Sequence, residues 1–132
     1  MGRAAIVTGG SRGLGRAVVK ALCGQGWTVA FSYLSNKQAA EALVAEVTKA
    51  GGTAHALQAD VADSAQAAAF VEQAKKALGD VDALVNNAGI TRDKSLFIMA
   101  REDWDAVIGT NLTGCFNVTR SMIAYFMKNK RG

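Results

Sequence analysis

Two stretches of this sequence carry residue types whose spacing is suited to chemistry. In YLSNK, Tyr33 and Lys37 stand four positions apart, which on a helix would place the ammonium beside the phenol and prepare it for proton transfer. In TGGSRGLG, residues 8–15, Gly9, Gly13 and Gly15 are spaced as a turn followed by two close-approach positions. Such a loop can present backbone N–H groups to a pyrophosphate. Which stretch forms a site depends on the elements that carry it.

Short β-rich runs alternate with longer segments of helical spacing along the chain. The runs cover residues 4–8, 28–33, 53–60 and 82–89, and the helical segments cover about 12–25, 36–50, 63–79 and 102–128. Strands that alternate with helices favour right-handed crossovers and a parallel sheet with helices on both faces. The pattern predicts one α/β domain over residues 1–132, a Rossmann-type doubly wound parallel sheet.

Apolar residues at helical spacing predict which faces of these helices are buried. The predicted buried groups are Leu14, Val18 and Leu22; Leu43, Val44 and Val47; Phe70, Val71, Ala74 and Leu78; and Trp104, Ile108, Cys115 and Met122. The two cysteines, Cys23 and Cys115, both fall in such patterns and are predicted to be buried, reduced thiols. This use of cysteine favours a reducing compartment.

Charge and composition indicate which classes of partner to expect. The 15 Lys and Arg residues exceed the 11 Asp and Glu residues by only four, and no arginine-rich run with interleaved aromatics indicates a nucleic-acid surface. The N-terminal run AAIV is too short for the apolar region of a signal peptide. We expect a cytoplasmic protein that binds neither nucleic acid nor a membrane.

The glycine stretch is specific because it lies between the first predicted strand and the first predicted helix, where a dinucleotide fold requires it. The alternative is a tight turn that binds no ligand. In NAD-binding versions of the fold, an acidic residue about 20 positions farther on binds the ribose 2′-OH. Here no acid precedes Glu41, whereas five cations do: Arg3, Arg12, Arg16, Lys20 and Lys37. The sequence therefore favours NADP(H), although Lys37 is equally well explained as an exposed residue in the first turn of a helix.

Several motifs in order resemble those of the short-chain dehydrogenase/reductases. They are TGGSRGLG, Asp60-Val61 after the third strand, Asn86-Asn87-Ala88-Gly89 after the fourth, and Asn111 in the fourth helix. The stretches NAGITRD and EDWDAVIGTNLTGCFNVT are most similar to the 3-oxoacyl-[acyl-carrier-protein] reductases and the acetoacetyl-CoA reductases. The resemblance implies an NADPH-dependent oxidoreductase that reduces a 3-oxoacyl thioester, carried by acyl carrier protein or coenzyme A, to the 3-hydroxyacyl form.

The resemblance also implies a role for individual residues. The pyrophosphate and 2′-phosphate would be bound by Gly9, Ser11, Arg12, Gly13, Leu14 and Gly15. Asp60 and Val61 would contact the adenine, and Asn87, Ala88 and Gly89 would lie beneath the riboses. Asn111 would hold a water in the proton relay while its side chain fills a break in the helical hydrogen bonding. Purely structural roles are the alternative for Asp60, Asn87 and Asn111.

The family's catalytic Tyr and Lys lie on a fifth helix, preceded by a Ser after a fifth strand. Tyr33 ends a strand and Lys37 begins a helix at the adenosine end, so YLSNK is not this pair. Tyr125 is followed four residues later by Asn129, and the sequence ends at Gly132. We expect an N-terminal half, truncated after the fourth βα unit, that lacks the catalytic Ser, Tyr and Lys and is inactive alone.

Truncation at this point would leave the fourth strand as an exposed edge able to pair with another chain. We expect a homo-oligomer for the full-length protein. The alternative function is a non-catalytic nucleotide-binding or assembly module that acts with a partner chain.

Overall fold

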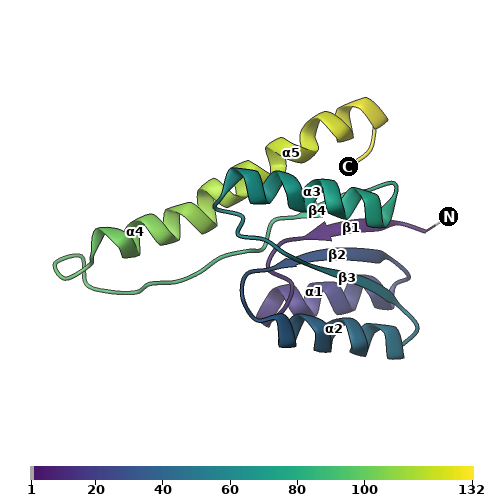
Figure 1. Ribbon diagram of the computed structural model, residues 1–132, viewed down its shortest axis with the longest axis horizontal. Helices are drawn as coiled ribbons and strands as arrows, with labels where there is room; N and C mark the ends of the chain where they lie inside the picture. Colours follow the sequence, from purple (N-terminus) through teal and green to yellow (C-terminus); the bar gives the residue numbers. More distant parts are fainter. Residues whose placement is uncertain (1) are drawn as a thin grey trace.

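The computed structural model describes residues 2–132 and shows a parallel sheet between two layers of helices (Figure 1). The elements are β1 (Ala4–Val7), α1 (Gly13–Gly24), β2 (Thr28–Tyr33), α2 (Lys37–Lys49), β3 (Thr53–Gln58), α3 (Ser64–Leu78), β4 (Ala83–Val85), α4 (Arg101–Ile108), the π-helical segment η1 (Gly109–Thr113) and α5 (Gly114–Asn129). The strand order is β3-β2-β1-β4, and every pairing is parallel. The predicted doubly wound α/β fold is confirmed.

Two apolar clusters hold the helices against opposite faces of the sheet. Along β1, Ile6 packs with Phe70 of α3 and Met122 of α5 in one cluster. The neighbouring Val7 packs with residues of α1 and α2, including Val19 and Leu43, in the other. Successive strand residues point to opposite faces, so a strand covered on both sides must be apolar throughout. All four residues of β1 are buried accordingly.

β2 has the predicted bounds, the other three strands are shorter than the sequence predicts, and β4 differs most. Residues 82–89 were expected to form a strand, but β4 ends at Val85. It pairs with β1 only over Ala5–Val7. Beyond that point the N–H of Asn87 donates to the Thr8 hydroxyl at 3.0 Å and leaves the ladder. Among the described residues β4 therefore has one neighbouring strand, as predicted for a sheet edge.

The buried face of α1 lies one position away from the predicted stripe. Its buried residues are Gly15, Val19 and Cys23, whereas the side chain of Leu14 is 74% exposed. The first turn of α1 borders an opening at the end of the sheet, so Leu14 has no layer to pack against. The predicted faces of α2 and α3 are correct, with Leu43 and Val47 buried in α2 and Phe70 and Val71 buried in α3.

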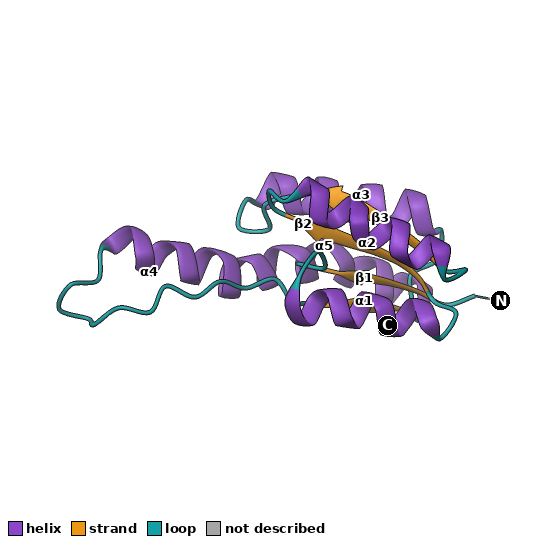
Figure 2. Cartoon of the chain, turned by 90° about the horizontal axis from the view of Figure 1, so that it is seen from below, coloured by secondary structure: helices purple, strands orange, loops and turns teal. Residues whose placement is uncertain are grey.

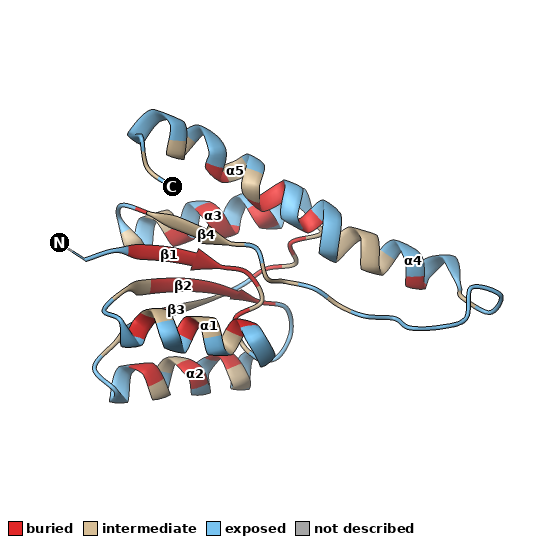
Figure 3. Cartoon of the chain, turned by 180° about the vertical axis from the view of Figure 1, so that it is seen from behind, coloured by how far each residue is buried: buried red, intermediate tan, exposed pale blue. Residues whose placement is uncertain are grey.

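The fourth predicted helix is interrupted at η1, where the N–H of Gly114 donates to the carbonyl of Gly109, five residues back. The stripe predicted for this helix is wrong at Trp104, which is 52% exposed, and at Cys115, which is exposed, whereas Ile108 is half-buried and Met122 is buried. Two causes combine. The π-helical turn rotates one part of the helix relative to the other, and α4 extends past the sheet (Figures 2 and 3).

We refer to residues 91–108, the loop before α4 together with α4, as the arm. Its loop exposes three consecutive apolar side chains, those of Leu96, Phe97 and Ile98. Within the arm, the loop is tied to α4 by Asp103, a buried residue whose carboxylate accepts bonds from Lys94 at 2.7 Å and Arg92 at 3.4 Å. The hydrogen bond from Lys94 contributes most to a lowered pKa of the Asp103 carboxyl. Within residues 2–132, no helix combines the length and apolar character needed to cross a bilayer.

Candidate functional site

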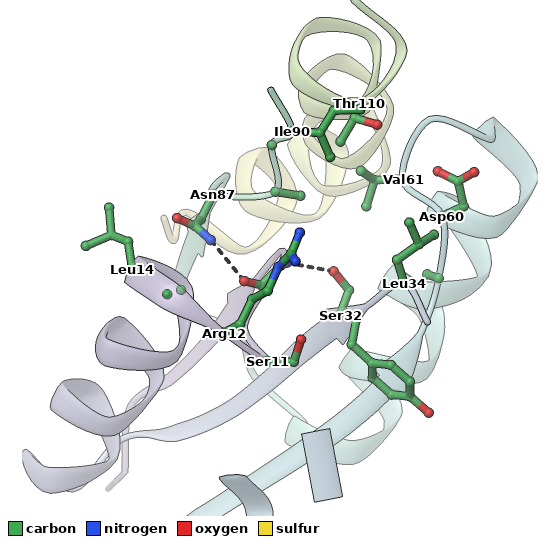
Figure 4. A pocket seen from close by; sticks show the side chains of 17 residues that line it. Ser11, Arg12, Leu14, Ser32, Leu34, Asp60, Val61, Asn87, Ile90 and Thr110 are labelled. Atoms are coloured by element: carbon green, nitrogen blue, oxygen red, sulfur yellow. Dashed lines mark hydrogen bonds between the residues drawn. The ribbon is translucent and has the colours of Figure 1, made fainter. Parts of the chain in front are cut away.

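A cavity of about 340 Å³ opens at the carboxyl ends of the strands (Figure 4). Its walls come from the loops after β1, β2, β3 and β4 and from η1. The lining residues are Gly9, Ser11, Arg12, Gly13, Leu14, Gly15, Ser32, Tyr33, Leu34, Ala59, Asp60, Val61, Asn87, Ala88, Gly89, Ile90 and Thr110. From β1 the chain adds β2 and β3 on one side, and the next strand, β4, lies on the other side of β1. Open α/β sheets bind ligands where the strand order switches in this way.

The glycine loop brings the backbone of β1 and α1 close to the chain after β4. A Cβ on Gly15 would overlap the carbonyl of Gly9 and the side-chain amide of Asn87. Gly13 has open space around its Cα, but its φ of +55° is a left-handed conformation that favours glycine. The sequence predicted two close-approach positions at Gly13 and Gly15. Of these two, only Gly15 makes a close approach within the chain, whereas position 13 favours glycine because its φ is positive.

A compact hydrogen-bond network joins this loop to the segment after β4. The Thr8 hydroxyl accepts from the N–H of Asn87 at 3.0 Å and from that of Ala88 at 2.9 Å. The Asn87 amide in turn donates to the carbonyls of Thr8 at 3.2 Å and Gly9 at 3.0 Å. Asn87 therefore fixes two walls of the cavity relative to each other. Sequence analysis missed Thr8, although its place directly before the glycines was a usable signal.

The first turn of α1 is not capped by a side chain. Arg12 is the N-cap residue and makes no side-chain capping bond, and no acidic residue stands in the first turn. By contrast, the side chain of Asn36 caps α2 and the side chain of Asp63 caps α3. The N–H groups at the start of α1 are thus left for another acceptor, and helix N-termini favour anions.

The cavity carries one arginine, because the other cations near the glycine loop are engaged elsewhere. Arg12 lies among the lining residues (Figure 4), whereas Arg16 and Lys20 both pair with Glu46 on α2. The hydrogen bond from Lys20 is the largest cause of the lowered pKa of the Glu46 carboxyl. Lys37 is 3.8 Å from Glu41 at the surface and does not line the cavity. The plain reading of Lys37 as an exposed first-turn residue is correct.

The end of β2 has no carboxylate at the cavity. Ser32, Tyr33 and Leu34 line it there, and the Ser32 hydroxyl accepts from the N–H of Gly9 at 3.0 Å. Across the cavity, Asp60 is the one acidic residue in the lining. Its carboxylate accepts from the N–H of Ala62 at 3.0 Å in a local turn. The wall that would face a ribose 2′ substituent is neutral apart from Arg12.

Asn111 lies in η1, at an adjacent opening that it shares with Arg12, Gly89 and Arg92. Its side chain forms two hydrogen bonds with Ile90, accepting from the Ile90 N–H at 2.8 Å and donating to the Ile90 carbonyl at 3.0 Å. The amide thereby ties the π-helical turn to the segment after β4. A role for Asn111 in a proton relay stays a prediction.

The structure brings all eleven predicted cofactor residues to one cavity, with Asn111 beside it. The sequence did not identify Ser32, Tyr33, Leu34, Ala59, Ile90 and Thr110 as lining residues. Tyr33 ends β2 and Lys37 starts α2, so they do not share a helix face, as predicted. The Tyr125 hydroxyl has a structural role, since it accepts from the N–H of Val81 at 2.9 Å. No group of His, Cys, Asp and Glu side chains suited to a metal ion occurs within residues 2–132.

Comparison with known proteins assigns the family. The model of the short chain dehydrogenase family matches residues 3–132. The chain belongs to this family. Among curated relatives, the 3-oxoacyl-[acyl-carrier-protein] reductase FabG of Staphylococcus aureus is 41% identical over 132 residues, and that of Synechocystis is 44% identical over 128. The acetoacetyl-CoA reductase of Paracoccus denitrificans is 42% identical over 132 residues.

This short-chain dehydrogenase sequence spans about half the length of those relatives, for example 54% of the Staphylococcus protein. The solved structures that are similar to this chain are likewise matched over only about half of their length. A blue fluorescent protein from a metagenomic library, in complex with NADPH, superposes with a TM-score of 0.87 at 43% identity, covering 93% of this chain and 51% of that one. A metagenomic short-chain oxidoreductase in complex with NADP gives a TM-score of 0.91 at 34% identity, covering 98% and 59%. The short-chain dehydrogenase family and the homologues of this chain are oxidoreductases.

Proposed function

We propose that the cavity binds NADP(H), with the pyrophosphate at the start of α1. The observation that carries the proposal is the uncapped first turn of α1, which opens onto the cavity while α2 and α3 are capped by their own side chains. Gly13 leaves open space above this turn, so backbone N–H groups are accessible to phosphate oxygens. Two solved relatives were captured with NADPH or NADP, which supports the same assignment.

We propose further that Arg12 selects the phosphorylated cofactor. It is the one basic residue in the lining of the main cavity, and the end of β2 offers Ser32, Tyr33 and Leu34 where an NAD site would offer a carboxylate. A guanidinium forms strong, charge-assisted hydrogen bonds with phosphate. On the other side of the cavity, Asp60 and Val61 would contact the adenine, and residues 87–89 would lie beneath the riboses.

For the reaction, we propose reduction of a 3-oxoacyl thioester by hydride from NADPH. The support is the similarity to 3-oxoacyl-[acyl-carrier-protein] and acetoacetyl-CoA reductases. The reduced cofactor supplies the hydride, and a proton donor must reach the carbonyl oxygen. Within residues 2–132 no Tyr–Lys pair lines the cavity. We propose that residues outside this sequence supply the donor, that the 132-residue chain alone is inactive, and that the whole protein is a homo-oligomer.

Titration of the intact protein with NADPH and NADH tests the cofactor assignment. We expect NADPH to bind at least about tenfold more tightly, a difference of about 1.4 kcal/mol, and Arg12→Ala to remove most of that preference. Arg16→Ala is the matched control, because Arg16 is another arginine of the same region but is paired with Glu46. It should leave the preference intact. Equal affinities for the two cofactors, or tighter binding of NADH, would reject the assignment.

A further inference from the structure

Ala59, Asp60 and Val61 form a wall of the cavity in the turn between β3 and α3. The ladder between β2 and β3 ends at Gln58, and α3 begins at Ser64. Between them, the N–H of Asp60 donates to the Gln66 side chain at 2.9 Å, and the Asp60 carboxylate accepts from the N–H of Ala62. These bonds shape the turn internally and tie it to α3. They leave the carbonyls of Val61 and Ala62 to find partners elsewhere.

Asn117 of α5 supplies those partners. Its side-chain amide donates to the carbonyl of Val61 at 2.9 Å and lies 3.4 Å from that of Ala62. Asn117 is 8% exposed, so water does not readily replace the amide, and a buried carbonyl without a donor is costly. Asn117 belongs to α5, far along the chain from the turn, yet it is one of the few polar residues buried in the described structure.

The first turn of α5 also approaches the same wall closely. A Cβ on Gly114 would stand 2.7 Å from the Cγ2 atom of Val61, so only glycine allows this approach. Asn117 lies on the following turn of the helix, on the face that is buried with Gly114 and Val118. Helix α5 therefore packs against one side of this wall. The other side of the wall lines the cavity opposite Leu14 and Asn87 (Figure 4).

We propose that Asn117 is a positioning residue that sets the adenosine side of the cofactor site. It does not line the cavity, and it acts by fixing the backbone of Val61 and thereby the position of Asp60 and Val61. The inference rests on the proposed binding of NADP(H).

The test compares ligand fragments in the intact protein. Asn117→Asp removes the amide donor at nearly constant volume, and Asn117→Leu removes it with a larger apolar side chain, so either one suffices if the other fails to fold. We expect affinity for NADPH and for 2′,5′-ADP to fall at least about tenfold, while affinity for reduced nicotinamide mononucleotide stays within about twofold. Binding is followed by calorimetry or by nicotinamide fluorescence, and each variant's thermal midpoint is recorded.

Two controls separate positioning from general loss of stability. Asn129→Asp makes the same change in the same helix, where the amide donates only to the carbonyl of Tyr125, and it should leave all affinities unchanged. Val47→Ala destabilises the cluster on the opposite face of the sheet and should lower the thermal midpoint without lowering affinity for 2′,5′-ADP.

The inference is overturned if the Asn117 variants bind 2′,5′-ADP normally, if they lose both halves of the cofactor equally, or if Val47→Ala loses 2′,5′-ADP to the same degree. Failure of the proposed function gives a different result: the unsubstituted protein then binds neither NADPH nor 2′,5′-ADP.

Discussion

The cavity and the arm are built in opposite ways. Around the cavity, main-chain groups of distant segments are joined by short side chains, as Thr8 and Asn87 join the loops after β1 and β4. In the arm, the one buried residue is Asp103, which bonds to the arm's own loop, and apolar side chains such as Phe97 are exposed, Phe97 by 96%. In Figure 3, β1 and β2 are mostly buried, whereas α4 is mostly exposed or intermediate.

The two regions differ in how far contacts within the described residues hold them. The loops that form the cavity walls are joined to one another and to α5, so their relative positions depend on contacts that the chain itself provides. The arm presents apolar surface that the chain does not cover, and contiguous exposed apolar residues usually belong to an interface. Substitutions in the cavity should therefore change ligand binding and stability together, whereas those in the arm should leave the stability of the sheet unaltered.

The largest expected effect on ligand binding is that of Gly15→Ala. The new Cβ would overlap the carbonyl of Gly9 and the amide of Asn87, and a rigid backbone cannot move aside cheaply. We expect about hundredfold weaker NADPH binding, or about 2.7 kcal/mol, measured by titration. Gly24→Ala in the same helix is the control, since nothing lies within 4 Å of its Cβ. It should be neutral or stabilising by up to about 1 kcal/mol, and a loss equal to that of Gly15→Ala would contradict the packing described here.

A pair of phenylalanines compares the two regions directly. Phe70 is 1% exposed between α3 and the sheet, and Phe97 is 96% exposed in the arm. Phe70→Ala should lower the free energy of unfolding by about 3–5 kcal/mol, whereas Phe97→Ala should change it by less than about 0.5 kcal/mol. Denaturant unfolding provides both values. Similar losses for the two variants would show that the arm is packed more tightly than its exposure indicates.

A smaller, local effect is expected for Asp103→Asn, which removes the charge that holds Lys94 and Arg92. Hydrogen exchange of residues 91–99 should become several-fold faster, with residues 4–7 unchanged. Asp105→Asn is the control, because Asp105 pairs with Arg101 at the surface. The folded pKa of Asp103 is lowered, so its contribution to stability is present above about pH 4. It is lost as pH falls through the lowered pKa, and the Asn variant should lack that loss.

The fold and the place of the glycine loop could be predicted because they depend on local signals. Alternation of strands and helices implied the parallel sheet, and a glycine loop between β1 and α1 located the cavity. The predicted helical segment 63–79 likewise begins at its N-cap, Asp63, and ends at Gly79. Each of these features is decided by a few neighbouring residues and by backbone conformation.

The errors concern features that depend on distant parts of the chain. Periodicity placed Leu14, Trp104 and Cys115 on buried faces, but it cannot show where a helix extends past its sheet or where a π-helical turn changes the face. The length of β4 was overestimated because Asn87 bonds to Thr8, which lies 79 positions earlier in the sequence. The role of Asn117 could not be predicted for the same reason, since its partners lie in a turn more than 50 residues earlier.

Hydrogen exchange of the intact protein with and without NADPH tests the central claim most directly, because it reports on both regions at once. The account predicts that NADPH protects amides in residues 9–16, 59–62 and 87–90, which surround the cavity, and leaves residues 94–105 of the arm unchanged. Protection confined to the arm, or no protection in residues 9–16 at saturating NADPH, would contradict the claim that the uncapped start of α1 is the phosphate site.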